Sequence, residues 1–552
     1  MIESASAVPR VRAPVVTRTT LAEALSLRPT ASGEVARRTD RSGFDWWLPI
    51  VVVCSILLCL PFLRTFFALD DEGVLLYGAD RMLQGKSLYG DFFEFLPPGG
   101  FVITALWFSL TGVSVLSARA LAILVIAGIA GFTYLTCRRA SRNAPLSAVL
   151  TLGWVVMSQG LWTQVNHHWL TTLFSITAAW AAFVSIEQAN RQLRWPLVAG
   201  VAAGMGAMIT PTCGALGMLA AVVAFVGVQP HKRVELSVFV LGCLVLPMCL
   251  IGYLLWRHVF AAAFDDVILF TARRYAPIQV LPFGDRANAQ NYPLMMLFPI
   301  AGVLLFLLCA RNWRASRSDR LLWLAAALGL AGFIGSFPRA DVAHIAFNVP
   351  LVLPLFALGV SRLAAQWRPW IRWSTAAAVI VFCVPSALAY ASLTAQTTRG
   401  ELISTARGQL ALFAPPGGAA MLARLAELPA AEKYFFYPFM PAMPFLTARE
   451  HVSKYDVFTP GYTLPSQYQG ACISVVQRGD WVVVDKRWMD PNYLRLVFPA
   501  MWDARPHEMA AFEEALNAAF AFAARDGVFE LWHRRDGIND AVCSNVADRA
   551  RE

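Results

Sequence analysis

The sequence predicts a polytopic α-helical membrane protein that carries an α/β domain at its C-terminal end. Of its 552 residues, 57% are hydrophobic and only 15% are charged, and the mean hydropathy is +0.52. Soluble domains are about half apolar and about a quarter charged, so this composition excludes a soluble globular enzyme. About 11 apolar stretches of roughly 15 to 24 residues lie between positions 46 and 394, near the length that crosses a bilayer.

The charges between these stretches predict the orientation of the chain. One set of loops holds fourteen basic and three acidic residues, whereas the alternate set holds nine basic and ten acidic residues. Positively charged loops remain in the cytoplasm, so the first set and an N-terminal disordered tail (1–45) are expected inside. The net charge of +10 therefore reflects membrane orientation and predicts no nucleic-acid partner. The basic loops contain Arg138, Arg139, Arg142, Arg191, Arg194, Lys232, Arg233, Arg311, Arg314, Arg317, Arg320, Arg362, Arg368 and Arg372.

Three parts follow from this pattern: the tail (1–45), a transmembrane domain (46–394) and, after an odd number of spans, an exterior α/β domain (395–552). The exterior part alternates between helical and strand-like patterns. The predicted helices cover 401–413, 421–428 and 506–525, and the predicted strands cover 434–437, 481–485 and 528–532. Its role is either support or acceptor recognition.

Some residues of the exterior domain are singled out by their chemistry. Cys472 and Cys543 are the two cysteines in this part. In an oxidising compartment they either form a disulfide or remain free, because the distance between them is not given by the sequence. Tyr455-Asp456 and the turn Pro460-Gly461-Tyr462 are candidate contacts with the membrane site.

The first exterior loop (70–114) begins with three consecutive acids, Asp70, Asp71 and Glu72. An amphipathic helix follows, and Pro97-Pro98-Gly99-Gly100 then breaks the chain. Acids at the edge of the lipid are poorly solvated, which raises their proton affinity and suits a general base. The alternative is that the three acids end one helix and cap the next.

Two motifs resemble elements of a known superfamily. The first exterior loop contains, in order, Asp71-Glu72-Gly73, Gly85, Tyr89, Asp91 and Pro97-Pro98. The segment from Phe337 to His344 has the form Arg-x-Asp-x-x-His. Both are similar to elements of the GT-C glycosyltransferases that use polyprenyl-phosphate sugars, such as protein O-mannosyltransferases and lipid A aminoarabinose transferases. Leu96 is a departure, because aminoarabinose transferases often carry a lysine there that contacts the donor phosphate.

This resemblance implies a reaction and a set of roles. A sugar would pass from an undecaprenyl- or decaprenyl-type phosphate to a glycan, lipid or protein acceptor on the outer face of the plasma (inner) membrane. Asp71 would be the general base, with Asp70 as second choice and Glu72 as part of the cluster. Arg339, with His344 as a further donor, would hold the donor phosphate, and Asp341 would orient one of them. The alternative is that Arg339 and Asp341 form an ion pair at the rim, with His344 at the interface. Some relatives use a metal and others do not, so the cofactor is left open.

Further charged residues are candidates for substrate contacts. Arg273 and Arg274, in a long exterior loop, could meet a lipid phosphate, although attraction to ordinary anionic headgroups explains them equally well. Lys86 is open to the same two interpretations. His167 and His168 either line the acceptor cavity or lie at the interface beside a tryptophan.

Two other classes of function remain as alternatives. A lipid-linked carrier or flippase would carry charges in the middle of its spans and paired half-helices. A non-catalytic envelope assembly protein would tolerate neutralisation of Asp71 without a chemical phenotype.

Overall fold

The structure is a computed structural model that describes residues 44–67, 69–187, 192–228, 233–499 and 506–549. The chain from residue 47 onward forms one compact unit. The predicted disorder of the tail concerns residues that lie, apart from Phe44 and Asp45, outside the described ones. Arg191 and Lys232 of the predicted basic loops also lie outside them.

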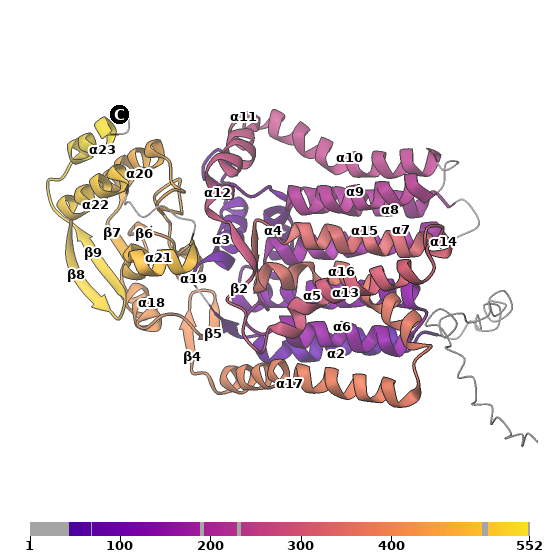
Figure 1. Ribbon diagram of the computed structural model, residues 1–552. Helices are drawn as coiled ribbons and strands as arrows, with labels where there is room; N and C mark the ends of the chain where they lie inside the picture. The colour runs from indigo at the N-terminus through magenta and orange to yellow at the C-terminus, as the bar shows by residue number, and fades with distance from the viewer. Residues whose placement is uncertain (1–43, 68, 188–191, 229–232, 500–505, 550–552) are drawn as a thin grey trace, which may run out of the picture. The chain divides into compact units, whose positions relative to one another are not determined.

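Long apolar helices run side by side and form a bundle (Figure 1). Six described helices are long and apolar enough to cross a membrane, and shorter apolar helices accompany them. The predicted total of about 11 spans therefore stays a prediction. The bundle contains α2 (Trp47–Cys59), α5 (Val115–Ser141), α6 (Ala144–Ser158), α7 (His167–Glu187), α8 (Arg194–Ala207), α9 (Pro211–Val228), α10 (Arg233–Trp256), α13 (Tyr292–Arg311), α15 (Arg320–Gly335), α16 (Val342–Ala364) and α17 (Pro369–Arg399).

The helices differ in how far their apolar surface is covered by protein. In α16, 83% of the most apolar window is buried, whereas in α17 only 6% is. A helix that is apolar all round and covered by neighbours belongs to the core of the bundle, and an uncovered one faces lipid. The structure thus places α16, whose first turn carries His344, at the centre and α17 at the periphery.

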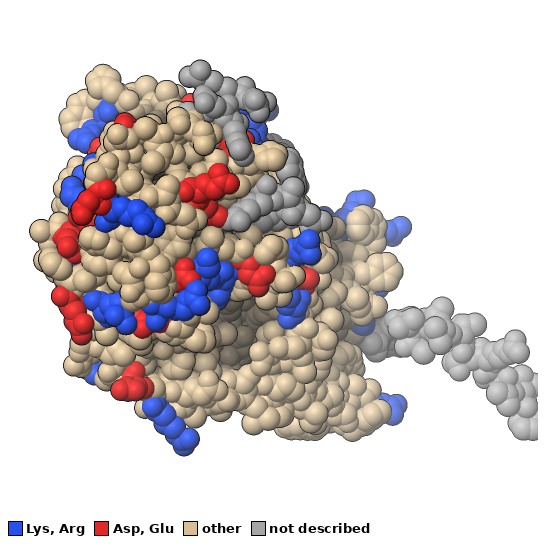
Figure 2. Space-filling model, turned by 90° about the vertical axis from the view of Figure 1, so that its left-hand side faces the viewer, with Lys and Arg blue, Asp and Glu red and all other residues tan. Residues whose placement is uncertain are grey.

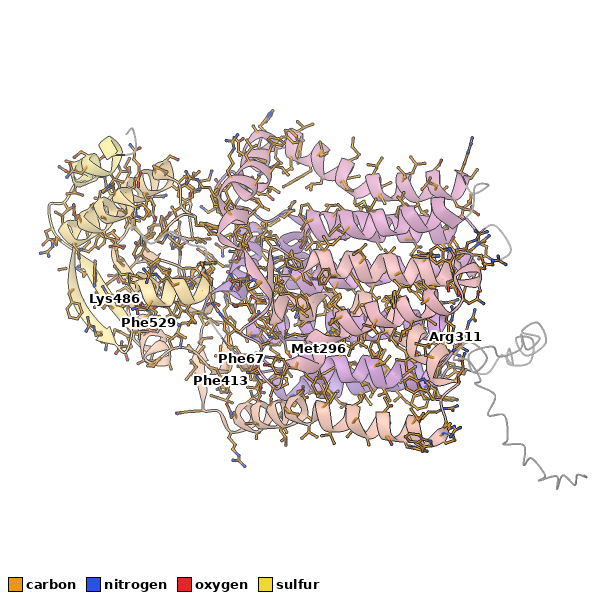
Figure 3. All side chains as sticks on the ribbon, in the orientation of Figure 1. Phe67, Met296, Arg311, Phe413, Lys486 and Phe529 are labelled. Carbon is orange, nitrogen blue, oxygen red and sulfur yellow. A yellow bond between two sulfur atoms is a disulfide. The ribbon has the colours of Figure 1, made fainter. Side chains whose placement is uncertain are left out.

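Ion pairs join the basic loops at one end of the bundle. Glu187, at the end of α7, binds Arg139 at 2.6 Å and Arg142 at 2.5 Å, both at the end of α5. Asp319 and Arg362 form a similar pair between α15 and α16, at 2.5 Å. Figure 3 shows Arg311 at this end of the bundle and Lys486, which follows the last long helix in the sequence, at the opposite end. The alternation of loop charge in the sequence therefore corresponds to the two ends of the bundle.

The first exterior loop folds into two helices, α3 (Asp71–Leu83) and α4 (Gly99–Thr111). The side chain of Asp70 caps α3 by accepting a hydrogen bond from the backbone of Asp71, at 2.9 Å. A helix is thus present where an amphipathic one was predicted, but its residues from Glu72 to Arg81 are all buried. The paired prolines come directly before α4, where proline is compatible with the start of a helix.

The segment after α17, residues 400–549, is called the C-terminal segment below. Its strands β6 (Tyr434–Tyr437), β7 (Trp481–Asp485), β9 (Phe529–Arg534) and β8 (Phe520–Asp526) form one sheet in that order. Strand β7 is central and nearly all buried, with Val483 opposite Phe436 on one side and Leu531 on the other. The helices with this sheet are α18 (Gly418–Glu427), α19 (Ala442–Thr447), α20 (Pro465–Arg478), α21 (Pro491–Val497), α22 (His507–Ala519) and α23 (Ser544–Arg549).

Two sequence predictions for this segment were wrong. Residues 401–413 form a hairpin, β4 (Leu402–Thr405) and β5 (Gly408–Leu412), instead of a helix. Gly408 has φ of +114°, which a glycine adopts without strain, and β5 also pairs with β1 (Thr65–Phe66) after the first helix. This long-range pairing is absent from the local pattern. The predicted helix 506–525 ends at Ala519, and the chain continues as β8.

The C-terminal segment is tied together covalently and carries a mixed surface. Cys472 of α20 and Cys543 form a disulfide with a Cα–Cα distance of 5.9 Å. Figure 2 shows basic and acidic residues interspersed over the face that this segment presents. Residues 395–552 include sixteen basic and eighteen acidic side chains, so the surface is nearly balanced in charge.

Helix α3 lies directly against the C-terminal segment. A Cβ atom added at Gly73 would lie 2.0 Å from the backbone nitrogen of Ala442, the first residue of α19. Only a glycine permits such a close approach of two backbones. The helix that begins with Asp71 is therefore held by α19, far away in the sequence.

Candidate active site

A cavity of about 210 Å³ lies where α3, the starts of α7 and α16, and the C-terminal segment meet. A short parallel pair of strands, β2 (Leu281–Asp285) and β3 (Arg339–Asp341), brings the second motif to its wall. Many of the predicted site residues line this cavity: Asp70, Asp71, His167, His168, Arg339, Asp341 and His344. The structure thus brings together two motifs that are more than 250 residues apart in the sequence.

Asp71 is the first residue of α3, and its side chain has solvent access through the cavity that it lines. Asp71 is exposed to solvent, although the protein atoms that line the cavity surround its carboxylate. This burial and the charge of Asp70 raise the pKa of Asp71 to about 7, against the opposing effect of Arg339. A carboxylate with such a pKa is suited to accept a proton near neutral pH.

Asp70 has two effects on its neighbour: its side chain caps the helix α3 that begins with Asp71, and its charge raises the pKa of Asp71. Burial raises the pKa of Asp70 too, although its hydrogen bond to the backbone of Asp71 and the charge of Arg487 oppose this. The carboxylate of Asp70 is committed to the start of α3. Asp71 has no such role, because no described residue donates a hydrogen bond to its carboxylate. Asp71 is therefore the member of the pair that is available for chemistry.

Arg339 is held in the cavity wall by two partners. Its Nε donates to Asp341 Oδ2 at 2.8 Å, and its Nη1 donates to Gln279 Oε1 at 2.9 Å. Arginine has five N–H donors, so within the described part of the chain Arg339 keeps donors for an anion. The guanidinium also lies 5.5 Å from the ring centre of Phe498.

Asp341 joins Arg339 to His344. Its Oδ1 lies 2.8 Å from Nδ1 of His344 and accepts a hydrogen bond from the backbone of His344 at 3.1 Å. Burial alone would raise the pKa of Asp341, but the hydrogen bond and charges of His344, with Arg339, hold it below its usual range. Because Arg339 is in a strand and His344 in the first turn of α16, both side chains reach one carboxylate despite their spacing of five residues.

Three imidazole rings lie along the membrane side of the cavity. The rings of His167 and His168 are 4.0 Å apart, and those of His168 and His344 are 4.7 Å apart. Phe347 stacks on His168 at 4.7 Å. Among the described residues, no group of three or more His, Cys, Asp or Glu side chains is placed to hold a metal ion.

Glu72 lies away from the cavity, in a buried ion pair. It is 3% exposed and contacts Arg119, which is fully buried, with Arg119 Nη2 at 2.7 Å from Glu72 Oε2. Glu72 also accepts a hydrogen bond from the backbone of Val165 at 3.0 Å, and Arg119 donates to the carbonyl of Thr65 at 2.8 Å. The pair therefore ties α3 to α5 and to the segment before α7.

The other predicted cations also lie outside the cavity wall. Arg273 is exposed and Arg274 is half-buried, on a π-helical segment, Asp265–Tyr275. Lys86 is exposed and lines a separate cleft between α3 and the C-terminal segment. The structure thus does not bring these three side chains to Asp71 and Arg339.

The cavity includes residues that sequence reasoning missed. They come mainly from the C-terminal segment and from loops next to it: Glu94, Tyr275, Gln279, Thr459, Trp488, Tyr493 and Phe498. Glu94 could have been noticed, because it is the only charge between Phe92 and Leu96. Asp456 and Tyr462, which were expected as contacts, do line the cavity.

Comparisons with known proteins agree with this architecture. A family model described as dolichyl-phosphate-mannose-protein mannosyltransferase matches residues 96–263. Crystal structures of ArnT from Cupriavidus metallidurans, bound to undecaprenyl phosphate and in the apo state, share 14% and 13% sequence identity with this chain. They cover 89% and 88% of it and 98% and 97% of their own chains, with TM-scores of 0.54 and 0.56.

A cryo-EM structure of the arabinofuranosyltransferase AftD from Mycobacteria shares 16% identity over 90% of this chain and 40% of AftD, with a TM-score of 0.47. A search of curated proteins finds no match. The chain is thus a multi-pass membrane protein with the fold of ArnT. Residues 96–263 resemble the mannosyltransferase family of that model, and the chain as a whole shares its fold with a solved membrane protein, ArnT.

Proposed function

We propose that this protein transfers a sugar from a polyprenyl-phosphate donor to a cell-envelope acceptor on the outer face of the plasma membrane. The observation that carries the proposal is that Asp71 and Arg339 line one cavity at the end of the membrane helices. A base and an anion-binding group at the membrane face are what this reaction needs, because the lipid tail keeps the scissile bond there. The family match and the undecaprenyl phosphate bound to ArnT support this donor class.

In the proposed reaction, the acceptor hydroxyl loses its proton to the carboxylate of Asp71. Its oxygen forms a bond to the anomeric carbon while the bond from that carbon to the phosphate oxygen breaks, which inverts the anomeric centre. The polyprenyl phosphate leaves with the electron pair, and Arg339 and His344 stabilise its charge. Asp341 positions both of these groups through its two oxygens. Glu72, Arg273, Arg274 and Lys86 have no part in this scheme.

The proposed orientation has two supports. The basic loops lie at the end of the bundle opposite the C-terminal segment, which fits a cytoplasmic location for those loops. The disulfide between Cys472 and Cys543 fits an oxidising compartment outside the cytoplasm. In this orientation the cavity opens on the same side as the C-terminal segment, which we propose to be the exterior domain (395–552).

The proposal is tested by mass spectrometry of envelope glycolipids, glycans and glycoproteins from a strain that lacks the protein. One sugar modification should disappear, and the wild-type chain should restore it, with polyprenyl phosphate as the product released from the donor. An unchanged envelope composition in a strain grown under conditions where the protein is made would contradict the proposal.

Arg339→Ala is expected to weaken binding of undecaprenyl phosphate by about tenfold to a hundredfold, since a hydrogen bond to a charged group contributes about 1.5–3 kcal/mol. The measurement is a titration of undecaprenyl phosphate against the purified chain in lipid nanodiscs. Arg273→Ala is the matched control, because it removes an arginine outside the cavity. If both variants bind undecaprenyl phosphate with equal affinity, Arg339 does not contact the donor phosphate.

The rate of transfer is expected to rise with pH and to level off near pH 7. Only the deprotonated carboxylate of Asp71 accepts a proton, and its pKa is about 7, so kcat/KM should fall about tenfold per pH unit below that value. The charge of Asp70 contributes to the raised pKa. Asp70→Asn keeps a capping side chain and should move the midpoint of the profile to lower pH. A midpoint that stays in place would contradict this coupling.

A further inference from the structure

Three buried polar side chains line the cavity: Glu94, Thr459 and Tyr462. The hydroxyl groups of Thr459 and Tyr462 have no hydrogen-bond partner among the described residues, and the carboxyl group of Glu94 lies in an ion pair, 3.9 Å from Nη2 of Arg81. The exposed fractions of these residues are only 4%, 1% and 4%. Buried polar groups in folded proteins are nearly always hydrogen-bonded, and each exception needs an explanation. A ligand in the cavity would supply the missing partners.

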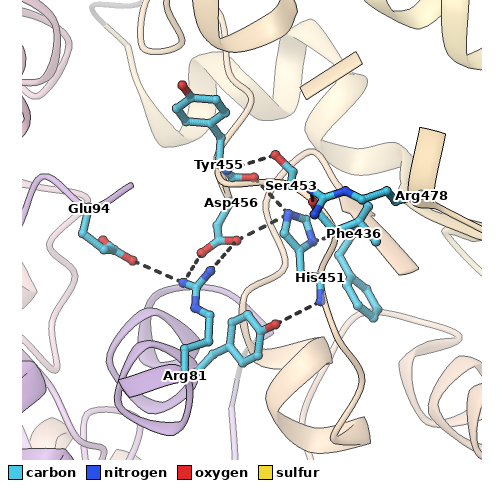
Figure 4. Close-up of polar contacts among 10 residues, drawn as sticks. Arg81, Glu94, Phe436, His451, Ser453, Tyr455, Asp456 and Arg478 are labelled. Atoms are coloured by element: carbon cyan, nitrogen blue, oxygen red, sulfur yellow. Dashed lines mark hydrogen bonds and ion pairs between the residues drawn. The ribbon is translucent and has the colours of Figure 1, made fainter. Parts of the chain in front are cut away.

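Glu94 shares the buried Arg81 with Asp456, which is the nearer of the two acids. Arg81 is buried between α3 and the C-terminal segment, and its Nη2 lies 2.5 Å from Oδ2 of Asp456 but 3.9 Å from Oε1 of Glu94 (Figure 4). Asp456 is further fixed by His451, whose Nε2 lies 3.4 Å from its Oδ1. The rings of Tyr77 and Phe92 hold the guanidinium in place. Asp456 thus takes the hydrogen bonds of Arg81, and the carboxyl group of Glu94 stays available to the cavity.

The charge state of these groups indicates which ligand they fit. Burial and the nearby charge of Asp456 raise the pKa of Glu94 well above its usual value, against the opposing charge of Arg81, which favours the neutral form of its carboxyl group. Burial likewise raises the pKa of Tyr462. The hydroxyl groups of Thr459 and Tyr462 are uncharged and can both donate and accept hydrogen bonds.

Aromatic rings complete this part of the cavity. The ring of Phe95 lies 4.5 Å from that of Tyr275 and 5.7 Å from that of Tyr462. Burial and the charge of Asp71 raise the pKa of Tyr275 to about 12, against the opposing charge of Arg339, and all three residues line the cavity. A mostly aromatic surface with a few convergent neutral polar groups is suited to a small ligand with many hydroxyl groups.

We propose that Glu94, Thr459 and Tyr462 form a subsite for an uncharged sugar ring in the cavity that Asp71 and Arg339 also line. This inference rests on the proposed function, because it names the chemistry of the ligand at the same cavity. The ring belongs either to the donor or to the terminal unit of a glycan acceptor. Both sources share the hydroxyl groups that the three side chains bind.

Binding of defined probes to the full chain in lipid nanodiscs tests the subsite. The donor form is undecaprenyl phosphate linked to mannose, glucose or arabinose, and the acceptor form is the methyl glycoside of each sugar, added with undecaprenyl phosphate. Tyr462→Phe and Thr459→Val each remove one hydroxyl and should weaken the best-binding sugar about three- to tenfold, the effect of one hydrogen bond. Weaker binding of the lipid-linked form assigns the subsite to the donor, and weaker binding of the glycoside assigns it to the acceptor.

Two controls separate the subsite from general damage. Tyr434→Phe also removes a buried hydroxyl that has no partner among the described residues, but Tyr434 does not line the cavity; sugar binding should be unchanged. Undecaprenyl phosphate itself should bind equally to Tyr462→Phe, Thr459→Val and the wild type.

The subsite is overturned if no sugar probe binds more tightly than undecaprenyl phosphate alone and no glycoside binds. It is also overturned if Tyr462→Phe and Thr459→Val bind the sugars as the wild type does. Failure of the proposed function is a different result, namely a wild-type chain that does not bind undecaprenyl phosphate. The two failures are therefore distinguishable.

Discussion

Asp71→Asn is expected to lower the rate of sugar transfer by about a hundredfold to ten-thousandfold, the usual contribution of general acid–base catalysis. An amide at this position cannot take the proton of the acceptor hydroxyl, although it has almost the same shape. In cells, a strain that lacks the protein and is complemented with Asp71→Asn should show the same missing sugar in envelope mass spectrometry as the uncomplemented strain.

The fold should be unaffected by this substitution, so that a loss of transfer can be assigned to the missing carboxylate. No described residue hydrogen-bonds to the carboxylate of Asp71, and the cap of α3 comes from Asp70. The thermal unfolding temperature and the binding of undecaprenyl phosphate should therefore stay near the wild-type values. Restoration of the wild-type glycan by Asp71→Asn would show that the base is another group, with Asp70 the first to test.

Arg119→Met is expected to destabilise the protein by about 3–5 kcal/mol, because it leaves the buried carboxylate of Glu72 without its partner. Glu72 and Arg119 are 3% and 0% exposed, so water does not replace the lost contact. The carbonyl of Thr65 also loses its donor. Thermal unfolding of the purified chain in nanodiscs measures the effect.

The ion pair between the exposed Arg142 and the largely buried Glu187 provides the matched control. The Arg142 side chain is 72% exposed, so Arg142→Ala should cost about 0–1 kcal/mol. The double variant Glu72→Gln with Arg119→Met should recover part of the stability and, if Glu72 is only structural, transfer activity as well. Unfolding of Arg119→Met at the wild-type temperature would contradict the stabilising role of the pair.

The sequence predicted those site residues that lie in short motifs. It did not predict residues that reach the cavity only because distant segments of the chain pack together. The acids at the start of α3 and the segment Arg339 to His344 were found in the sequence, and the structure places Asp71 and Arg339 in one cavity. The sequence around Asp70, Asp71 and Glu72 does not indicate which of these side chains faces the cavity and which forms a buried ion pair. On a helix, consecutive residues point about 100° apart, so Asp71 and Glu72 face different neighbours.

Long-range contacts account for the remaining differences. The partner of Glu72 is Arg119, 47 positions away, and the sequence does not show which buried faces meet. The same holds for β5, whose pairing with β1 overrides the helical pattern of 401–413. In the sequence, the aromatic residues in and around α21 look like ordinary core residues. Packing of this region nevertheless brings three of them to the cavity: Trp488, Tyr493 and Phe498. Local periodicity predicted the bundle well because each span satisfies its own backbone hydrogen bonds.

The close contact between Gly73 and Ala442 limits how this protein can be recombined with its relatives. The backbone carrying the base has no room for even a methyl group between it and α19. A chimaera that takes only its last 150 or so residues from another member would misplace α3 unless the two surfaces match. The smallest unit that can be exchanged, by design or in evolution, is then a pair of segments from opposite halves of the gene.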